Sequence, residues 1–280
     1  MSISLDQTSI DKLSEDIIKK SLTTRWLGQH VIQYFDVVAS TNTEARRLAR
    51  EGAPEGTLIV ADAQTKGRGR LGRSWVSPPG TGLYLSIILR PDCPADWLPK
   101  LTLTAGVAVA STIRQTGLTP QLKWPNDILI ADRKVGGILT EAVFDRRRID
   151  FAILGIGVNV NMERNELPIS IRNLAGSLRL GLGEPLSRIH LIQTLLQQIE
   201  QWYESFQTGL FATILETWCE FDTTLGREVE VFLPEKRLVG VAEALGSDGT
   251  LLVRDRTDCL HSVVAGDVVY CHLKPSSDLK

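Results

Sequence analysis

The sequence predicts an α+β fold in which a central mixed β-sheet flanked by helices is followed by a small β-barrel. Up to about residue 223, apolar runs of strand length alternate with amphipathic stretches of helical period. From about residue 225 the pattern changes to short alternating strands separated by Asp-Gly and Gly turns. We therefore expect a helical extension over residues 1–24, a main domain over 25–224 and a barrel domain over 225–280.

Composition limits the classes of protein that fit. The 280 residues suffice for a full core, and the net charge of −2 with a pI near 6.1 argues against a general nucleic-acid binder. The four cysteines show no Cys-x-x-Cys pair and no metal-ligand spacing with the histidines, which favours a reduced, cytoplasmic protein. The sequence has no apolar signal core and no run of membrane-spanning length. We expect binding to neither DNA nor membranes, and the oligomeric state is open between a monomer and a homodimer.

The first predicted elements lead into a loop rich in glycine. Residues 1–24 hold one short amphipathic helical candidate, and residues 31–38 predict the first strand. Thr41 and Glu44 have the Thr-x-x-Glu spacing of a capping box, which predicts a helix that begins there and ends near Gly52. Two further strands are predicted over 57–64 and 82–89. The loop between them joins two strands of a sheet, which is a common place for a ligand site.

Residues 66–75, here called the basic loop, alternate cations with glycines and end in Trp75. Glycines permit positive φ and close backbone approach, and arginine makes paired charge-assisted hydrogen bonds. The N–H groups and guanidinium groups of such a loop can converge on one anion, a phosphate or a carboxylate. The alternative is a solvated loop or a patch that touches nucleic acid. Because the whole chain is slightly acidic, a local anion site is favoured.

The second half of the main domain places polar residues at turns. One helix is predicted over 101–116, and two packing helices are predicted over 185–206 and 211–218. Between residues 121 and 141, three strands are joined by a Pro-Asn-Asp turn and a second turn, which on their own are most simply structural. Residues 151–161 predict a buried strand whose glycines indicate close approach by a neighbour or ligand, and Asn159 within it needs a polar partner. The polar residues that gather at the turns are Lys123, Asn126, Asp127 and Lys134.

Three segments in order resemble the signatures of biotin protein ligases. Gly-Arg-Gly-Arg-Leu-Gly-Arg-Ser-Trp at 67–75 is similar to the family's basic loop, Lys-Trp-Pro-Asn-Asp at 123–127 to its second motif, and Lys-Val-Gly-Gly-Ile-Leu at 134–139 to its third. Ser-Thr-Asn at 40–42 precedes them, and the resemblance spans about residues 31–270. It implies the class II synthetase-like catalytic fold of biotin and lipoate ligases. Only about 30 residues precede the first predicted strand, too few for the winged helix-turn-helix of one class, so the chain resembles the ligase-only class.

The activity that this resemblance implies has two steps. Biotin and ATP with Mg²⁺ give biotinyl-5′-AMP, and biotin then passes to one lysine of the carboxyl-carrier domain of a biotin-dependent carboxylase of the acetyl-CoA carboxylase type. No tightly bound metal is implied, and no metal ligands are assigned. The alternative is a lipoate or octanoate ligase or transferase of the same superfamily. A linear acyl chain needs an apolar tunnel, whereas Gln64 and the full basic loop favour biotin.

The resemblance also implies which residues form the site. A carboxylate brought against the α-phosphate of ATP needs cations to spread the developing charge, so Arg68, Arg70 and Lys134 are expected catalytic residues. Asp127, which the resemblance places by the nucleotide, the metal or the incoming lysine, is the fourth. Hydroxyl and amide groups suit the ureido ring of biotin. The expected substrate-binding residues are Ser40, Thr41, Asn42, Gln64, Gly67, Arg68, Gly69, Arg70, Lys134, Gly136 and Gly137. The expected nucleotide-binding residues are Arg70, Arg73, Trp75, Lys123, Asn126, Asp127 and Asn159.

Overall fold

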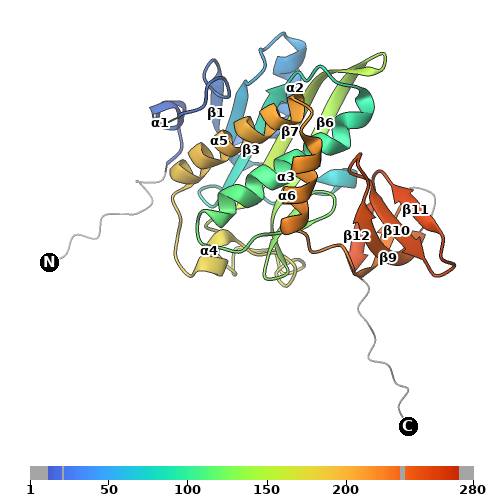
Figure 1. Cartoon of the computed structure of the whole chain (residues 1–280). Coiled ribbons are helices and arrows are strands. Elements are labelled where there is room, and N and C mark those ends of the chain that lie inside the picture. The colour runs from blue at the N-terminus through green and yellow to red at the C-terminus, as the bar shows by residue number, and fades with distance from the viewer. Residues whose placement is uncertain (1–11, 21, 234–236, 271–280) are drawn as a thin grey trace.

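The computed structural model describes residues 12–20, 22–233 and 237–270 and contains two β-sheets (Figure 1). The larger sheet has seven strands in the order β1-β2-β3-β7-β6-β5-β4, in which β1 and β2 are parallel and the other neighbours antiparallel. Its strands are β1 (Ile32–Val38), β2 (Leu58–Gln64), β3 (Gly82–Leu89), β4 (Gln121–Lys123), β5 (Asp127–Ile130), β6 (Arg133–Asp145) and β7 (Arg148–Asn159). The predicted mixed sheet is confirmed.

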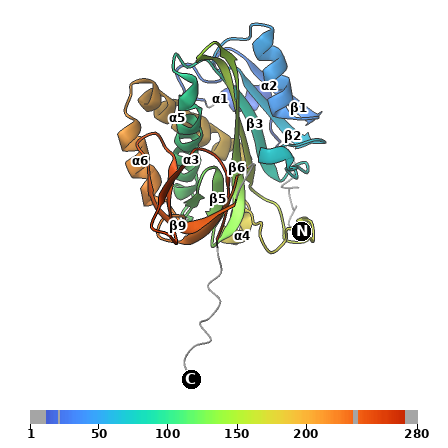
Figure 2. The same ribbon diagram turned by 90° about the vertical axis from the view of Figure 1, so that its right-hand side faces the viewer.

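Helices cover the two faces of this sheet unequally, as the edge-on view in Figure 2 shows. The helices are α1 (Glu15–Lys20), α2 (Thr41–Arg50), α3 (Leu98–Arg114), α4 (Leu178–Leu182), α5 (Arg188–Gln207) and α6 (Phe211–Glu220), with short 3-10 turns at Arg70–Gly72 and Ala95–Trp97. The main core lies between the sheet and α3, α5 and α6. Helix α2 covers the other face over a small cluster that includes Ala45, Ile88 and Ile153. The rest of that face is therefore available for a site.

Strand β7 shows how the sequence opens space on the α2 face. Alternate side chains of a strand point to opposite faces, so Ile153, Gly155, Gly157 and Asn159 share one face. Ile153 packs in the small cluster under α2, whereas the glycines leave room for side chains from other segments. A Cβ at Gly155 would lie 2.0 Å from Asn42 Oδ1. The prediction that these glycines mark close approach is confirmed.

The start of α2 differs from the predicted capping box. Ser40 is the N-cap residue, and its side chain makes no capping hydrogen bond within the described residues. The N–H of Thr41 instead donates to Gln64 Oε1 at 2.9 Å, and Glu44 forms an ion pair with Arg47. The capping box is wrong because a side chain from β2 satisfies the first free N–H of the helix.

The N-terminal helix packs on the main core. Residues 1–11 and 21 of the predicted extension lie outside the described residues, and the predicted short helix is present as α1. Leu13 and Ile18 are fully buried, and Gln193 of α5 donates to the carbonyl of Ile18. Glu200 of α5 also accepts hydrogen bonds from the N–H groups of residues 25–27. The segment that precedes β1 is thus attached to α5.

The C-terminal sheet has five antiparallel strands in the order β11-β10-β9-β8-β12. These are β8 (Glu228–Phe232), β9 (Arg237–Leu245), β10 (Leu251–Asp255), β11 (Leu260–Val263) and β12 (Asp267–Tyr270). No ladder joins β11 to β12 among the described residues, so the predicted barrel is an open sheet. Residues 264–266 connect these two edge strands, and four residue steps span at most about 14 Å. The sheet therefore curls until its edges approach, and the connection forms a seam between them.

Trp124 joins the two sheets. It is buried to 2% exposure, and its Nε1 donates to the carbonyl of Gly249 in the C-terminal sheet at 3.1 Å. The N–H of Trp124 also donates to Thr224 Oγ1 at 2.9 Å. One hydrophobic cluster includes side chains of both sheets. The boundary near residue 224 stays a prediction, and the parts on either side of it are packed together.

Candidate active site

A cavity of about 1180 Å³ lies on the free part of the α2 face. Its walls come from the start of α2, the basic loop, the strands β5 to β7, residues 162–175 and the C-terminal sheet. Of the predicted site residues, Gly67 and Gly136 are not among the residues that line it. The cavity is lined by the others, namely Ser40, Thr41, Asn42, Gln64, Arg68, Gly69, Arg70, Arg73, Trp75, Lys123, Asn126, Asp127, Lys134, Gly137 and Asn159.

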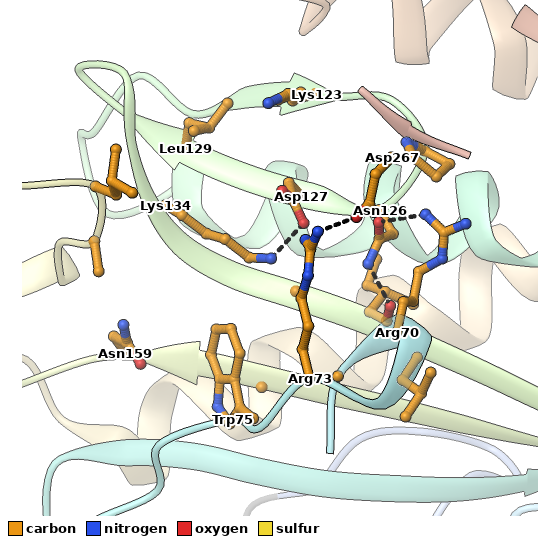
Figure 3. A pocket seen from close by; sticks show the side chains of 18 of the residues that line it. Arg70, Arg73, Trp75, Lys123, Asn126, Asp127, Leu129, Lys134, Asn159 and Asp267 are labelled. Atoms are coloured by element: carbon orange, nitrogen blue, oxygen red, sulfur yellow. Dashed lines mark hydrogen bonds and ion pairs between the residues drawn. The ribbon is translucent and has the colours of Figure 1, made fainter. Parts of the chain in front are cut away.

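Lys134 lies near the centre of this cavity (Figure 3). Strand β6 carries it next to β5, so its Nζ lies 2.5 Å from Asp127 Oδ1. The same Nζ lies 5.6 Å from the centre of the Trp75 ring. Because Asp127 is the carboxylate beside it, an anionic ligand that approaches Lys134 must compete with that ion pair.

Arg70 and Arg73 connect the basic loop to the seam of the C-terminal sheet. Arg70 Nη1 donates to Asn126 Oδ1 at 3.1 Å and to the carbonyl of Gly266 at 3.2 Å, and Arg73 forms an ion pair with Asp267. Burial lowers the pKa of Arg70 from its usual value. Asn126 is itself fixed, because its Nδ2 donates to the carbonyl of Ile138 at 2.8 Å. The loop therefore bridges the two sheets.

Trp75 lies on the sheet over Gly157. A Cβ at Gly157 would lie 2.6 Å from Trp75 Nε1, so any larger residue would displace the ring. The ring also contacts Gly137, where a Cβ would lie 3.4 Å from Cζ3. Its Nε1 is buried and has no hydrogen-bond partner among the described residues. Glycine at 157 thus creates the flat surface on which Trp75 borders the cavity.

A cluster of hydroxyl and amide groups forms another part of the wall. Gln64 Oε1 accepts hydrogen bonds from the N–H and Oγ1 of Thr41, at 2.9 and 3.2 Å. Ser86 Oγ donates to Asn42 Oδ1 at 2.7 Å and lies within hydrogen-bond distance of Thr41 Oγ1, at 2.8 Å. Ser40 is buried beside them. Thr41, Asn42 and Gln64 are thus brought together as predicted.

Arg68 points to a different partner from the other loop arginines. Its guanidinium binds Glu141 of β6 through two hydrogen bonds, of 2.8 and 3.2 Å. It still lines the cavity. Its predicted contact with a bound anion stays a prediction.

The two glycines that do not line the cavity have structural roles. A Cβ at Gly67 would lie 2.4 Å from the carbonyl of Trp75, since the two ends of the basic loop pair closely. A Cβ at Gly136 would lie 3.2 Å from the carbonyl of Gly157 in the neighbouring strand. Both glycines therefore allow backbone segments to approach and do not form the cavity wall.

Asn159 has the polar partner that the sequence requires. Its Nδ2 donates to the carbonyl of Gly176 at 2.9 Å, which ties the end of β7 to the segment after residue 162. That segment contributes apolar side chains to the cavity, including Met162, Leu167 and Ile171. The amide of Asn159 therefore supports this wall of the cavity.

The C-terminal sheet adds residues that sequence reasoning missed. Tyr270 lies between two cations, with Lys123 Nζ 4.5 Å and the Arg227 guanidinium 4.4 Å from its ring centre. Burial lowers the pKa of Lys123 from its usual value. Arg227, Asp267 and Tyr270 all line the cavity. No pattern in the sequence of the C-terminal strands indicates that they reach the main sheet.

The described lining has an excess of positive charge. Its cations are Arg68, Arg70, Arg73, Lys123, Lys134 and Arg227, and its carboxylates are Asp127, Asp132, Glu228 and Asp267. In a partly buried cavity such cations bind phosphate or carboxylate groups and stabilise charge that moves between them. The hydroxyl and amide cluster suits a neutral ring with donors and an acceptor. This arrangement can hold an acid next to a nucleotide phosphate.

Comparison with known proteins decides the family. Residues 34–159 match the model of the biotin/lipoate A/B protein ligase family. The bifunctional ligase/repressor BirA of Bacillus subtilis is 40% identical over 258 residues, which cover 92% of this chain and 79% of that protein. The chain belongs to the biotin protein ligase family. The predicted resemblance is thereby confirmed.

The match to two further members of this family covers nearly the whole length of each. The biotin–[acetyl-CoA-carboxylase] ligase of Mycobacterium tuberculosis is 32% identical over 280 residues, which cover 94% of this chain and 99% of that protein. The biotin protein ligase of Aquifex aeolicus, solved in complex with biotin and ATP, superposes with a TM-score of 0.74. It is 31% identical, and the match covers 86% of this chain and 99% of that structure.

None of the helices in the described residues combines the length and hydropathy of a membrane span.

Proposed function

We propose that this chain is an ATP-dependent biotin protein ligase that forms biotinyl-5′-AMP and transfers biotin to one lysine of a carboxyl-carrier domain. The observation that carries the proposal is the meeting of two groups of residues in one cavity. The hydroxyl and amide cluster of Thr41, Asn42 and Gln64 shares this cavity with the cations Arg70, Arg73 and Lys134. The Aquifex aeolicus relative was solved with biotin and ATP, the two substrates that such a cavity requires.

The hydroxyl and amide cluster is proposed to bind the ureido ring of biotin. This ring offers two N–H donors and one carbonyl acceptor, and hydroxyl groups can serve either kind of partner. The buried hydroxyl of Ser40 and the side chains of Thr41 and Gln64 are the proposed partners. The hydrogen bonds among these groups fix their positions before the ligand arrives, which lowers the entropic cost of binding.

The cations are proposed to hold the two reacting anions. In the first step a biotin carboxylate oxygen attacks the α-phosphorus of ATP, the bond to the bridging oxygen breaks, and pyrophosphate leaves. Lys134 is proposed to lie between the carboxylate and the α-phosphate, with Arg70 and Arg73 on the phosphates. In the second step the neutral amine of the acceptor lysine attacks the acyl carbon, AMP leaves with the bonding electrons, and the amine loses a proton. Asp127 is the carboxylate proposed to receive that proton.

Trp75 and the seam of the C-terminal sheet are proposed to surround the nucleotide. The Trp75 ring offers a flat apolar surface held over Gly157, and aromatic rings stack well on bases. Asn126 accepts a hydrogen bond from Arg70, and Lys123 is paired with Asp127 in the sheet. Asn159 is proposed to approach the nucleotide from the end of β7.

Mg²⁺ is proposed to accompany the ATP phosphates. Mg²⁺ in nucleotide sites keeps several waters and is bound by one or two carboxylates together with phosphate oxygens. The donor set of the cavity fits this mode, because Asp127 lines it next to Lys134. The ion would offset phosphate charge, and this chain's cations supply the remainder.

The partner is proposed to be the carboxyl-carrier domain of a biotin-dependent carboxylase in the cytoplasm. We propose no DNA or membrane as a partner. The test is incubation of the purified chain with labelled biotin, MgATP and a carrier domain. Carrier labelling that lipoate in excess does not suppress supports the proposal. Labelling of the carrier by lipoate or octanoate in place of biotin would contradict it.

A further inference from the structure

Glu141 occupies a position that the proposed reaction does not explain. It lies on β6, on the same face as Gly137, and its side chain is 18% exposed. Its Oε1 accepts hydrogen bonds from Arg46 at 3.0 Å and from Arg68 at 3.2 Å. Its Oε2 accepts from Arg68 at 2.8 Å and from Asn42 Nδ2 at 2.9 Å. This carboxylate thus joins α2 to the start of the basic loop, although it does not itself line the cavity.

A chain of buried polar groups continues from Glu141 to the far end of the basic loop. Asn42 Oδ1 accepts a hydrogen bond from Ser86 Oγ, which also lies within hydrogen-bond distance of Thr41 Oγ1, at 2.8 Å. Thr41 bonds to Gln64, and Gln64 Nε2 donates to Ser77 Oγ at 2.9 Å. Ser77 Oγ in turn donates to the carbonyl of Trp75 at 3.2 Å. The chain therefore connects both ends of the basic loop through the proposed biotin-binding cluster.

We propose that Glu141 is a positioning residue that sets the geometry of the biotin-binding cluster and of the first half of the basic loop. This inference rests on the proposed function. Glu141 touches no substrate and acts through two side chains of the cavity wall. Arg68 is held against the sheet, and Asn42 is oriented so that its Oδ1 faces Ser86. Side chains that orient a site's direct contacts reduce the freedom that binding must remove.

Of the two side-chain groups of this shape, a carboxylate and an amide, only the carboxylate accepts hydrogen bonds at both ends. Four donor atoms surround it, from Arg46, Arg68 and Asn42, and an ionised carboxylate accepts at both oxygens. The variant Glu141→Gln has nearly the same shape but turns one oxygen into an NH₂ group. In either orientation of the amide, that group would face two donors, one of them from Arg68, and a buried donor without an acceptor is costly. We expect Glu141→Gln to keep the fold and to release Arg68 of the basic loop from its contact with β6.

The first measurement is amide hydrogen exchange of the basic loop without ligands. The N–H of Gly69 bonds to the carbonyl of Arg73, and the N–H of Trp75 bonds to that of Gly67. In Glu141→Gln these amides are expected to exchange about tenfold faster, because the charge-assisted anchor of Arg68 is lost. Arg46→Gln is the matched control, since it removes the other guanidinium from the same carboxylate and Arg46 does not line the cavity.

The outcomes of this measurement separate positioning from general stabilisation. Arg46→Gln is expected to leave loop exchange within about twofold of the parent. Equal acceleration in both variants would overturn the proposal, as would unchanged exchange in Glu141→Gln. If Glu141→Gln does not fold, Arg68→Gln removes the same contact from the loop side, and unchanged loop exchange in that variant would overturn the proposal.

The second measurement is the kinetics of adenylate formation. Glu141→Gln is expected to raise the KM for biotin about tenfold with kcat changed less than about threefold, because Lys134, Arg70 and Arg73 are not bonded to Glu141. A loss confined to kcat would overturn the proposal. In the ligand-free exchange measurement, the double variant with Arg68→Gln is expected to exchange no faster than Glu141→Gln alone, since both substitutions break the same contact. Effects that add in full would also overturn it.

The two proposals fail in different ways. If the parent chain bound no biotin by calorimetry, the proposed function would be wrong, whatever Glu141 does. Loop exchange needs no ligand, so it would still test the positioning role. If the parent bound biotin and Glu141→Gln matched it in loop exchange and in KM, the positioning role alone would be wrong.

Discussion

Lys134 and Asp127 form an ion pair on the adjacent strands β6 and β5, with Lys134 Nζ 2.5 Å from Asp127 Oδ1. The ammonium thus has a partner before any anion arrives. In the proposed reaction a carboxylate and an α-phosphate meet at Lys134, so its contribution is expected to grow as charge develops between them.

We expect Lys134→Ala to lose adenylate formation far more than biotin binding. Loss of one such stabilising group costs about 2.7–4 kcal/mol in the transition state, or roughly a hundred- to thousandfold in rate. Single-turnover adenylation measures the rate, and calorimetry measures biotin affinity. Lys100→Ala is the control. Lys100 does not line the cavity, and its Nζ lies 4.3 Å from the centre of the Trp97 ring. Near-parental adenylation in Lys134→Ala would remove it from the catalytic residues.

We expect Arg70→Gly to release the adenylate early. Arg70 is the loop cation that contacts both Asn126 and the seam of the C-terminal sheet. Loss of a charge-assisted contact of about 1.5–3 kcal/mol raises the off-rate by roughly ten- to a hundredfold. Released adenylate acylates exposed lysines, so bystander proteins become labelled. Leu71→Ala, in the same turn at a side chain 70% exposed, is the control. A parental adenylate lifetime in Arg70→Gly would mean that the loop only supports the fold.

We expect Gly157→Ala to weaken ATP binding by displacing Trp75. The added Cβ would lie 2.6 Å from Trp75 Nε1, so the ring must move. Loss of base stacking costs about 1–3 kcal/mol, or roughly 5- to 150-fold in affinity. Gly106→Ala on α3 is the control, because its nearest neighbours lie at 3.5 Å and alanine favours the helix. ATP affinity is measured by calorimetry in the presence of a non-reactive biotin analogue. Equal affinity in both variants would contradict the stacking role of Trp75.

The lowered pKa of Lys123 predicts a dependence of stability on pH. Burial is the main cause, so the folded state binds this proton less tightly than the unfolded chain. At neutral pH the charged side chain therefore costs stability, and this cost disappears as pH rises through the lowered pKa toward 10.5. Urea unfolding at a series of pH values should show the parent gaining stability relative to Lys123→Met over that interval. A constant difference between the two would contradict the assignment.

We expect a chain that ends at Thr224 to keep biotin affinity and to lose ATP affinity. The hydroxyl and amide cluster lies before that residue, whereas Arg227, Asp267 and Tyr270 lie after it and line the cavity. The truncation also exposes Trp124, so the melting temperature should fall. Calorimetry with each ligand measures the two affinities. A soluble, folded truncation product that bound no biotin would contradict the predicted division at residue 224.

Local sequence predicted much of the fold, because apolar residues recur with one period in helices and with another in strands. The strand at 82–89 and the glycine-marked strand β7 agree with the structure, since continuous apolar runs specify buried strands. The start of α2 was not predictable in the same way. Gln64, which binds the N–H of Thr41, is 23 residues away, and no local pattern reveals such a partner.

The site shows the same limit at longer range. The three motifs meet at the cavity, and most of the predicted site residues line it, because each motif lies at the end of a strand of one sheet. Arg68 was expected on the anion, and only the structure shows its bond to Glu141. The sequence did offer one indication of this partner, because Glu141 lies four residues after Gly137 on the same strand and therefore on the same face. Tyr270 and Asp267 carried no such signal, because curling of the C-terminal sheet places them in the cavity.

The ion pair between Arg73 and Asp267 couples the binding of an anion to the attachment of the C-terminal sheet. An anion that draws Arg73 away from Asp267 also releases the C-terminal sheet from one of its attachments to the basic loop. By thermodynamic reciprocity, if the bound anion changes the affinity of a partner for this sheet, the partner changes the affinity of the anion by the same factor. A partner that binds the C-terminal sheet and favours this ion pair would therefore weaken the binding of an anion that must break it.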